Sequence, residues 1–177
     1  MKENTRGRII SVPVESAYVT QHKLVLGSLE WLFWHFDRNL EGTLGPPVVH
    51  KIGRHAWIVD GHNYFAIASL FQKEEVQAYV PKNKKDEMSA EEFPKIHPQG
   101  LIDRNGNIDQ LSQKVRQGHD MQKEGLRHIR DLREKVPFLE NIDTTRRILY
   151  PPEQHSPEEY ADMGPPEYYL FDPQEVQ

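Results

Sequence analysis

Residues 47–80 read PVVHKIGRHAWIVDGHNYFAIASLFQKEEVQAYV, and this stretch decides the fold that we expect for the chain. Two β-branched runs, residues 48–52 and 56–60, flank a glycine turn and predict a hairpin. Residues 63–71 are nearly apolar all round, which predicts a short helix that covers a sheet. Residues 75–80 then predict another strand, so strand and helix signals alternate over a short length of chain.

A polar corner, Asp60-Gly61-His62, separates the second of these strands from the helix. Such residues pack poorly between a buried strand and a buried helix, so we expect them to bind something. The N-terminus of a helix offers free backbone N–H groups and a partial positive charge, which suit a phosphate or another anion. The sequence therefore predicts a ligand site at this corner.

The sequence upstream of the hairpin predicts one more strand and one more helix. Residues 8–14, RIISVPV, form a β-branched run that is typical of a strand. Ser28 is a favourable N-cap residue, so we expect a helix to begin there. Large apolar side chains then recur at helical spacing: they are Leu29, Leu32, Phe33, Phe36 and Leu40.

The order of these elements and the polar corner resemble the ParB/sulfiredoxin superfamily over residues 8–80. The matching stretches are residues 47–49, residues 57–62 with Asp-Gly-His at their end, residues 66–68 and residues 76–80. The resemblance implies an α+β fold, with a small mixed sheet and packed helices. A helical segment and an extended acidic tail would follow this domain.

Members of this superfamily bind nucleotides or phosphates at the corner. The resemblance puts Gly61, His62 and Asn63 at the phosphate-binding positions, and Asp60 at the acidic position of the Asp-Gly-His subgroup. The chain departs from the pattern at Tyr64, where an arginine is common. The sulfiredoxin cysteine and the helix-turn-helix of partition proteins are also missing, so we expect neither of those roles.

Two classes of function remain open, and the first is an enzyme. Asp60 and His62 are then the candidate catalytic residues: His62 contacts a phosphate or acts as acid and base, and Asp60 orients His62 or holds a metal. Phe93 and residues 101–106 resemble the putative ParB-like nuclease branch. The reaction would be phosphoryl transfer or phosphodiester hydrolysis, and a nucleotide with a divalent cation is the candidate cofactor.

The second class is a non-catalytic module that binds protein or DNA through the helical segment and the acidic tail. Asp60 and His62 are then a structural pair, in which Asp60 caps the helix. His50 and Arg54 of the hairpin are further candidate ligand-binding residues, although Arg54 at the tip also fits a solvated side chain. Two histidines with Asp60 could hold a metal, but lone histidines more often form hydrogen bonds, so we predict no metal site.

The length of 177 residues predicts one domain with appendages. We assign residues 1–81 to the ParB/sulfiredoxin-like domain, residues 82–107 to a linker and turn, and residues 108–150 to the helical segment. Residues 151–177 contain six prolines and seven acidic side chains without a lysine or arginine. This composition predicts an extended tail that binds a protein partner, folds onto its own domain or stays disordered.

The helical segment contains Gly118 and Gly125, which weaken its middle, so we expect two helices or one helix with a break. The formal net charge of −5 argues against a large non-specific nucleic-acid surface and leaves a local basic patch open. The chain has no cysteine, which excludes disulfides and cysteine nucleophiles. It lacks an apolar run of membrane-spanning length, so a soluble cytoplasmic protein that does not bind membranes is expected.

Overall fold

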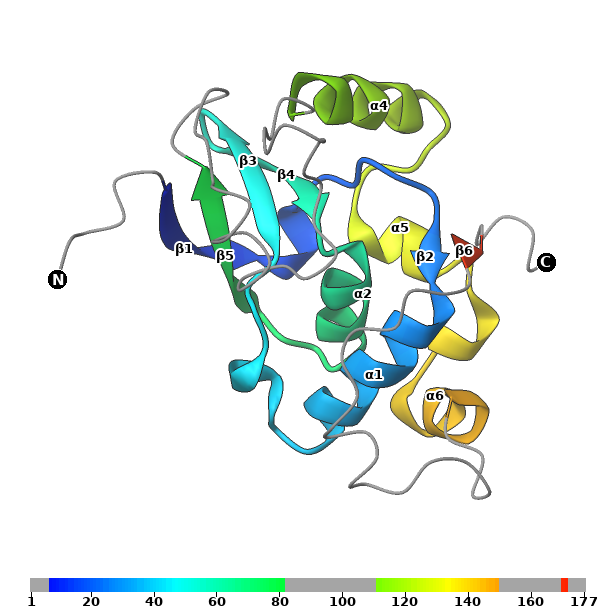
Figure 1. Ribbon diagram of the computed structural model, residues 1–177. Coiled ribbons are helices and arrows are strands. Elements are labelled where there is room, and N and C mark those ends of the chain that lie inside the picture. The colour runs from blue at the N-terminus through cyan, green and yellow to red at the C-terminus, as the bar shows by residue number, and fades with distance from the viewer. Residues whose placement is uncertain (1–6, 82–110, 150–169, 172–177) are drawn as a thin grey trace, which may run out of the picture.

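The structure is a computed structural model that describes residues 7–81, 111–149 and 170–171. Within these ranges, five α-helices pack around a four-stranded mixed sheet of order β1-β5-β3-β4 (Figure 1). The strands of the sheet are β1 (Gly7–Pro13), β3 (Val48–Ile52), β4 (His55–Asp60) and β5 (Glu75–Pro81). The helices are α1 (Leu26–Asp37), α2 (His62–Leu70), α4 (Leu111–Lys123), α5 (Ile129–Arg133) and α6 (Ile142–Leu149).

The sheet combines both kinds of strand pairing. Strand β5 runs antiparallel to β1 along its whole length and parallel to β3, where Val48 pairs with Tyr79. Strands β3 and β4 form an antiparallel hairpin. The predicted small mixed sheet with packed helices is therefore confirmed, while the specific ParB-like fold stays a prediction.

The local elements follow the sequence pattern closely, with one error. The hairpin, α2 and β5 lie where the sequence predicts them, within one residue. Helix α1 begins at Leu26 and has Val25 as its N-cap, so the prediction that Ser28 begins this helix is wrong. The cause is the short strand β2 (Leu24–Val25), which leads directly into the helix and leaves Ser28 buried inside its first turn.

An extended segment, residues 18–20, lies along the open side of β4. The Tyr18 N–H donates to the Ala56 carbonyl and the Ile58 N–H donates to the Tyr18 carbonyl, both at 2.8 Å. On the other side, the Val19 N–H donates to the Arg127 carbonyl at 3.0 Å. This segment therefore joins the sheet to the chain that leads into α5.

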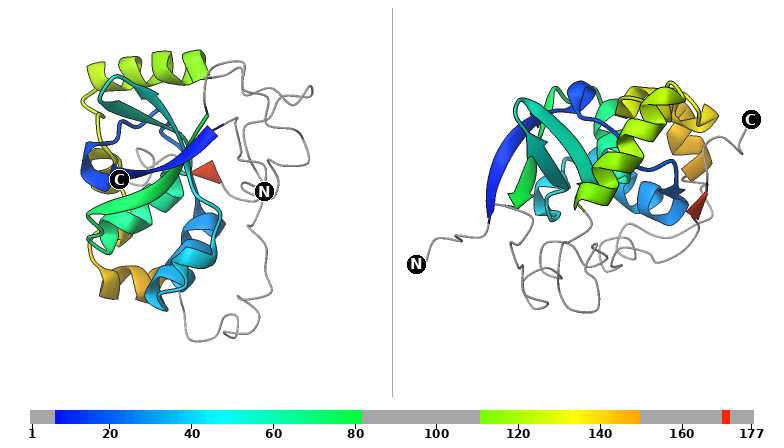
Figure 2. Two further views of the ribbon diagram at one scale, coloured as in Figure 1. Left: turned by 90° about the vertical axis from the view of Figure 1, so that its left-hand side faces the viewer. Right: turned by 90° about the horizontal axis from the view of Figure 1, so that it is seen from above.

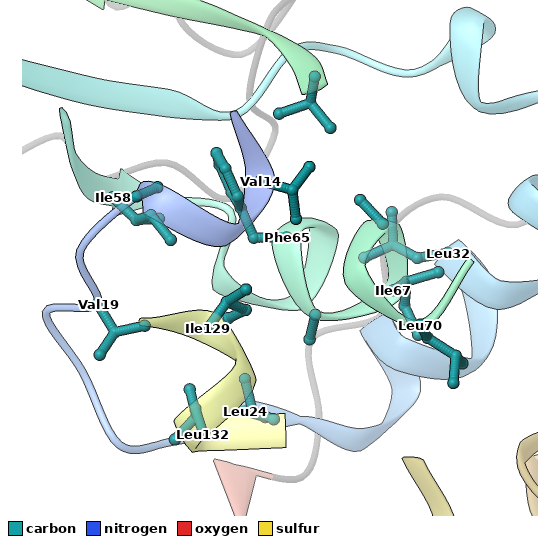
Figure 3. Packing of buried hydrophobic residues seen from close by; sticks show 14 of the residues in the cluster. Val14, Val19, Leu24, Leu32, Ile58, Phe65, Ile67, Leu70, Ile129 and Leu132 are labelled. Carbon is teal, nitrogen blue, oxygen red and sulfur yellow. The ribbon is translucent and has the colours of Figure 1, made fainter. Parts of the chain in front are cut away.

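The buried core is continuous across the described residues. It extends from β1 through α1, α2 and β5 to the helices after residue 110. Figure 3 shows Ile129 and Leu132 of α5 in one cluster with Val19, Leu24 and Phe65. Helix α5 thus completes the core beside α2 and is not a separate hydrophobic unit.

Helix α4 lies over the β3–β4 hairpin, as Figures 1 and 2 show. Gly118 allows this close approach, because a Cβ atom at this position would lie 2.6 Å from the Trp57 ring. The helix continues through Gly118 and ends before Gly125, whose φ of +85° follows the last turn. The expected break therefore exists, and it occurs at Gly125.

Two further segments complete the description. Strand β2 pairs antiparallel with β6 (Leu170–Phe171), which brings these two residues of the acidic tail beside the start of α1. The predicted linker and turn at residues 82–107 lie outside the described residues, as do Phe93 and residues 101–106. Among the described helices, none combines the length and apolar character that crossing a membrane requires.

The contact between Gly118 and Trp57 gives a first test. We expect Gly118→Ala to lower the free energy of unfolding by about 1–3 kcal/mol, because the added methyl group pushes α4 away from β4. An alanine inside an unconstrained helix would instead stabilise it by about 1 kcal/mol relative to glycine. Urea denaturation of wild type, Gly118→Ala and the control Gln117→Ala, which changes an exposed neighbour, measures the change in the free energy of unfolding. A Gly118→Ala protein that is more stable than wild type would contradict the close packing of α4 on Trp57.

Candidate functional site

A bulge in β4 determines where Asp60 points. Val49 pairs with Ile58, but the preceding Val48 pairs with Asp60, so Val59 is an extra residue in β4. Paired residues share a face of a sheet and alternate residues of one strand share a face. Asp60 therefore lies on the face of the hairpin that carries Trp57 and that α4 covers.

Gly61 makes the turn between β4 and α2. Its φ of +112° is in the left-handed region, which side chains other than glycine rarely adopt. A Cβ atom here would also lie 2.5 Å from the Cβ of Pro47. The backbone alone therefore requires glycine at this position, whatever ligand the corner binds.

His62, the first residue of α2, is 1% exposed. Its Nε2 accepts a hydrogen bond from the Thr20 N–H at 2.9 Å, and the Thr20 hydroxyl donates to the Ile58 carbonyl at 2.6 Å. Because Nε2 accepts, the neutral ring carries its proton on Nδ1, which is buried and has no hydrogen-bond partner among the described residues. Burial holds the pKa of His62 well below its usual value of 6.5, and the nearby charge of Lys114 adds to this effect.

Lys114 of α4 brings a positive charge to the corner. Its Nζ donates to Oε1 of Gln21 at 3.2 Å, and Gln21 follows directly after the Thr20 that binds His62. Burial lowers the pKa of Lys114, and attraction to the Asp60 carboxylate opposes the shift. Lys114 therefore interacts electrostatically with both Asp60 and His62.

Sequence patterns alone did not identify Lys114 as a site residue. The available signal was Gly118: a glycine inside a helix can mark the face that packs closely, and Lys114 lies one turn earlier on that face. The resemblance leads one to expect an arginine at the position that Tyr64 occupies in α2. In this chain the positive charge near the corner comes instead from Lys114 of α4. The ring of Tyr64 instead packs edge-on against Phe36.

The other predicted site residues lie at different places. Asn63 adjoins the corner, but its Oδ1 accepts the Val25 N–H at 2.9 Å and so ties α2 to β2. His50 pairs with Trp57 in the hairpin, and exposed Arg54 lies at the hairpin tip, at the opposite end of β4 from Asp60. The structure therefore brings together Asp60, Gly61 and His62 with Lys114, and leaves Arg54 apart.

The hydrogen bonding of His62 limits the acid–base chemistry that this residue can perform. A general base needs a ring nitrogen that can take a proton from a substrate. In His62, Nε2 already accepts the Thr20 N–H and Nδ1 already carries a proton. Over the described ranges, no group of three or more histidine, cysteine or acidic side chains is placed to hold a metal ion.

The pKa of His62 predicts how stability depends on pH. Its folded-state pKa lies below the unfolded value of about 6.5, so below that pH the unfolded chain binds a proton that the folded chain does not. The free energy of unfolding should therefore fall between pH 7.5 and pH 5.5, by on the order of 1 kcal/mol from this residue. Urea denaturation at several pH values checks this, and His62→Gln should remove that part of the slope. An equal slope in both proteins would mean that His62 is not buried as a neutral ring.

Comparison with known proteins adds no relative from which residue roles could be transferred. No protein-family model matches the chain, and no curated protein matches its sequence. The description of the corner therefore rests on the geometry of Asp60, Gly61, His62 and Lys114.

Proposed function

We propose that this protein binds a phosphate-bearing ligand, such as a nucleotide, at the Asp60-Gly61-His62 corner of a ParB/sulfiredoxin-like domain. The observation that carries the proposal is the position of Lys114, which α4 holds at this corner. Burial disfavours the charged form of this lysine. A bound phosphate would stabilise the ammonium group, because an opposite charge nearby raises the pKa of a lysine.

The start of α2 provides the second part of the proposed site. The first N–H groups of a helix have no partner inside the helix, and they favour a negative charge. The conformation of Gly61 lets the chain turn abruptly from β4 into this helix. His62 holds the turn in place through its hydrogen bond with Thr20, so in this proposal it positions the site.

Binding is favoured over acid–base catalysis by His62. Its ring is enclosed, neutral and hydrogen-bonded to the backbone, which suits a structural role better than proton transfer. Asp60 is the residue that would hold a divalent cation accompanying a nucleotide, since Mg²⁺ binds through one or two carboxylates together with phosphate oxygens. The alternative, a module that acts through the helical segment and acidic tail, stays a prediction.

Calorimetric titration with inorganic phosphate and with ATP, each with and without Mg²⁺, tests the proposal. We expect wild type to bind a phosphate-bearing ligand, and Lys114→Gln to bind it at least about ten-fold more weakly, because one charge-assisted contact is lost. Lys123→Gln is the matched control, since it removes an exposed lysine from the last turn of the same helix. Its affinity should stay within about two-fold of wild type.

The stability of the variants separates loss of binding from loss of folding. Lys114→Gln removes an ammonium group whose charge is disfavoured by burial, so it should unfold at no lower urea concentration than wild type. Equal affinities of wild type and Lys114→Gln would contradict the proposal. Wild type that binds neither phosphate nor ATP would contradict it as well.

A further inference from the structure

A hollow lies away from the corner, between β1, β5 and the loop that follows α1. Its volume is about 480 Å³, which is within the range of small-molecule sites. Phe36, Leu44, Tyr64 and Ile9 line its apolar part. Ile9 is 53% exposed, so part of this apolar lining is accessible to solvent.

Charged groups form the other part of this hollow. Oε1 of Glu41 pairs with the Nζ of Lys73 at 3.2 Å, while Oε2 of Glu41 is enclosed and has no hydrogen-bond partner in the described part of the chain. Glu75 also lines the hollow. Two carboxylates and one ammonium group leave one negative charge, which a monocation would neutralise.

Tyr64 supplies an aromatic ring near this negative charge. Burial raises the pKa of Tyr64 to about 12, and the charge of the nearby Glu41 carboxylate adds to the shift. The ring stands edge-on to Phe36 with centroids 5.1 Å apart. Aromatic faces beside a carboxylate favour an ammonium group over a neutral or anionic one.

We propose that the hollow bounded by Phe36, Glu41 and Tyr64 binds a monocationic amine with an apolar body. The ammonium group lies near Glu41 and the Tyr64 ring, and the apolar body covers Leu44 and Ile9. This site is independent of the phosphate corner, although both use α2: His62 belongs to the corner and Tyr64 to the hollow.

Three probes that share a phenylethyl body and differ in the charge of their polar group test the proposal on the full chain. They are 2-phenylethylamine, 2-phenylethanol and 3-phenylpropanoate, titrated at pH 7 while ¹H–¹⁵N NMR spectra are recorded. We expect saturable shifts with the amine at the amides of Gly42, Tyr64 and Val76. The alcohol should bind at least about five-fold more weakly. The carboxylate should not bind at these residues, since it would lie beside two carboxylates.

Two variants test which side chains bind the amine, and a third variant is the control. Glu41→Gln should weaken amine binding at least about ten-fold, because it removes the charge while keeping the shape of the side chain. Tyr64→Phe leaves the ring in place and should weaken binding less than Glu41→Gln. Glu74→Gln, an exposed neighbour outside the hollow, should leave the affinity within about two-fold.

The proposal is overturned if the carboxylate binds as tightly as the amine, or if millimolar amine gives no saturable shifts at these residues. Unchanged affinity in Glu41→Gln overturns it as well. If the NMR spectrum of Glu41→Gln shows that this variant is unfolded, the comparison of the three probes on the wild-type protein still tests the proposal. Phosphate titrations of Lys114→Gln report on the corner and not on this hollow, so the two proposals fail separately.

Discussion

The hydrogen bond from the Thr20 N–H to Nε2 of His62 is the constraint on which the corner depends. It joins three elements, because the Thr20 hydroxyl also bonds to the Ile58 carbonyl of β4 and His62 begins α2. A buried hydrogen bond of this kind holds only while the ring accepts at Nε2, so the fold requires a neutral imidazole. His62, one of the two candidate catalytic residues, therefore stabilises the fold through this hydrogen bond.

The two faces of β4 pack against different parts of the structure. Ile58 faces the core that α2 and α5 complete, while Trp57 faces α4. Gly118 lets α4 approach Trp57 closely, and one turn away the same helix holds Lys114 at the corner. The positive charge of the proposed site therefore depends on the packing of α4 against Trp57 of β4.

Elements whose hydrophobic pattern lies entirely within their own residues could be predicted from the sequence. The hairpin at residues 48–60, helix α2 and strand β5 each carry their own periodic signal and their own breakers. The start of α1 was not predicted correctly, because the favourable N-cap Ser28 is overridden by strand β2 immediately before it. Strict alternation would also place Asp60 on the face of Ile58, and the bulge at Val59, which has no sequence signal of its own, reverses this.

The composition of the site was harder to predict than its location. Asp60-Gly61-His62 stands out because polar residues interrupt an apolar stretch, whereas Lys114 lies in a charged helix where one lysine resembles another. Its role depends on a contact between segments far apart in the chain, and periodicity carries no information about such contacts. The burial of His62 is likewise a property of how residues 18–20 lie along β4.

The most direct test of this account is the protonation state of His62, measured by long-range ¹H–¹⁵N NMR of its imidazole ring as pH is lowered. We predict a neutral ring with the proton on Nδ1 and an unprotonated Nε2, which does not titrate until well below pH 6.5. A ring that titrates near pH 6.5, or that carries its proton on Nε2 at neutral pH, would contradict the account. His62 would then be able to exchange protons, and the hypothesis that it acts as an acid or base would be favoured over a structural role.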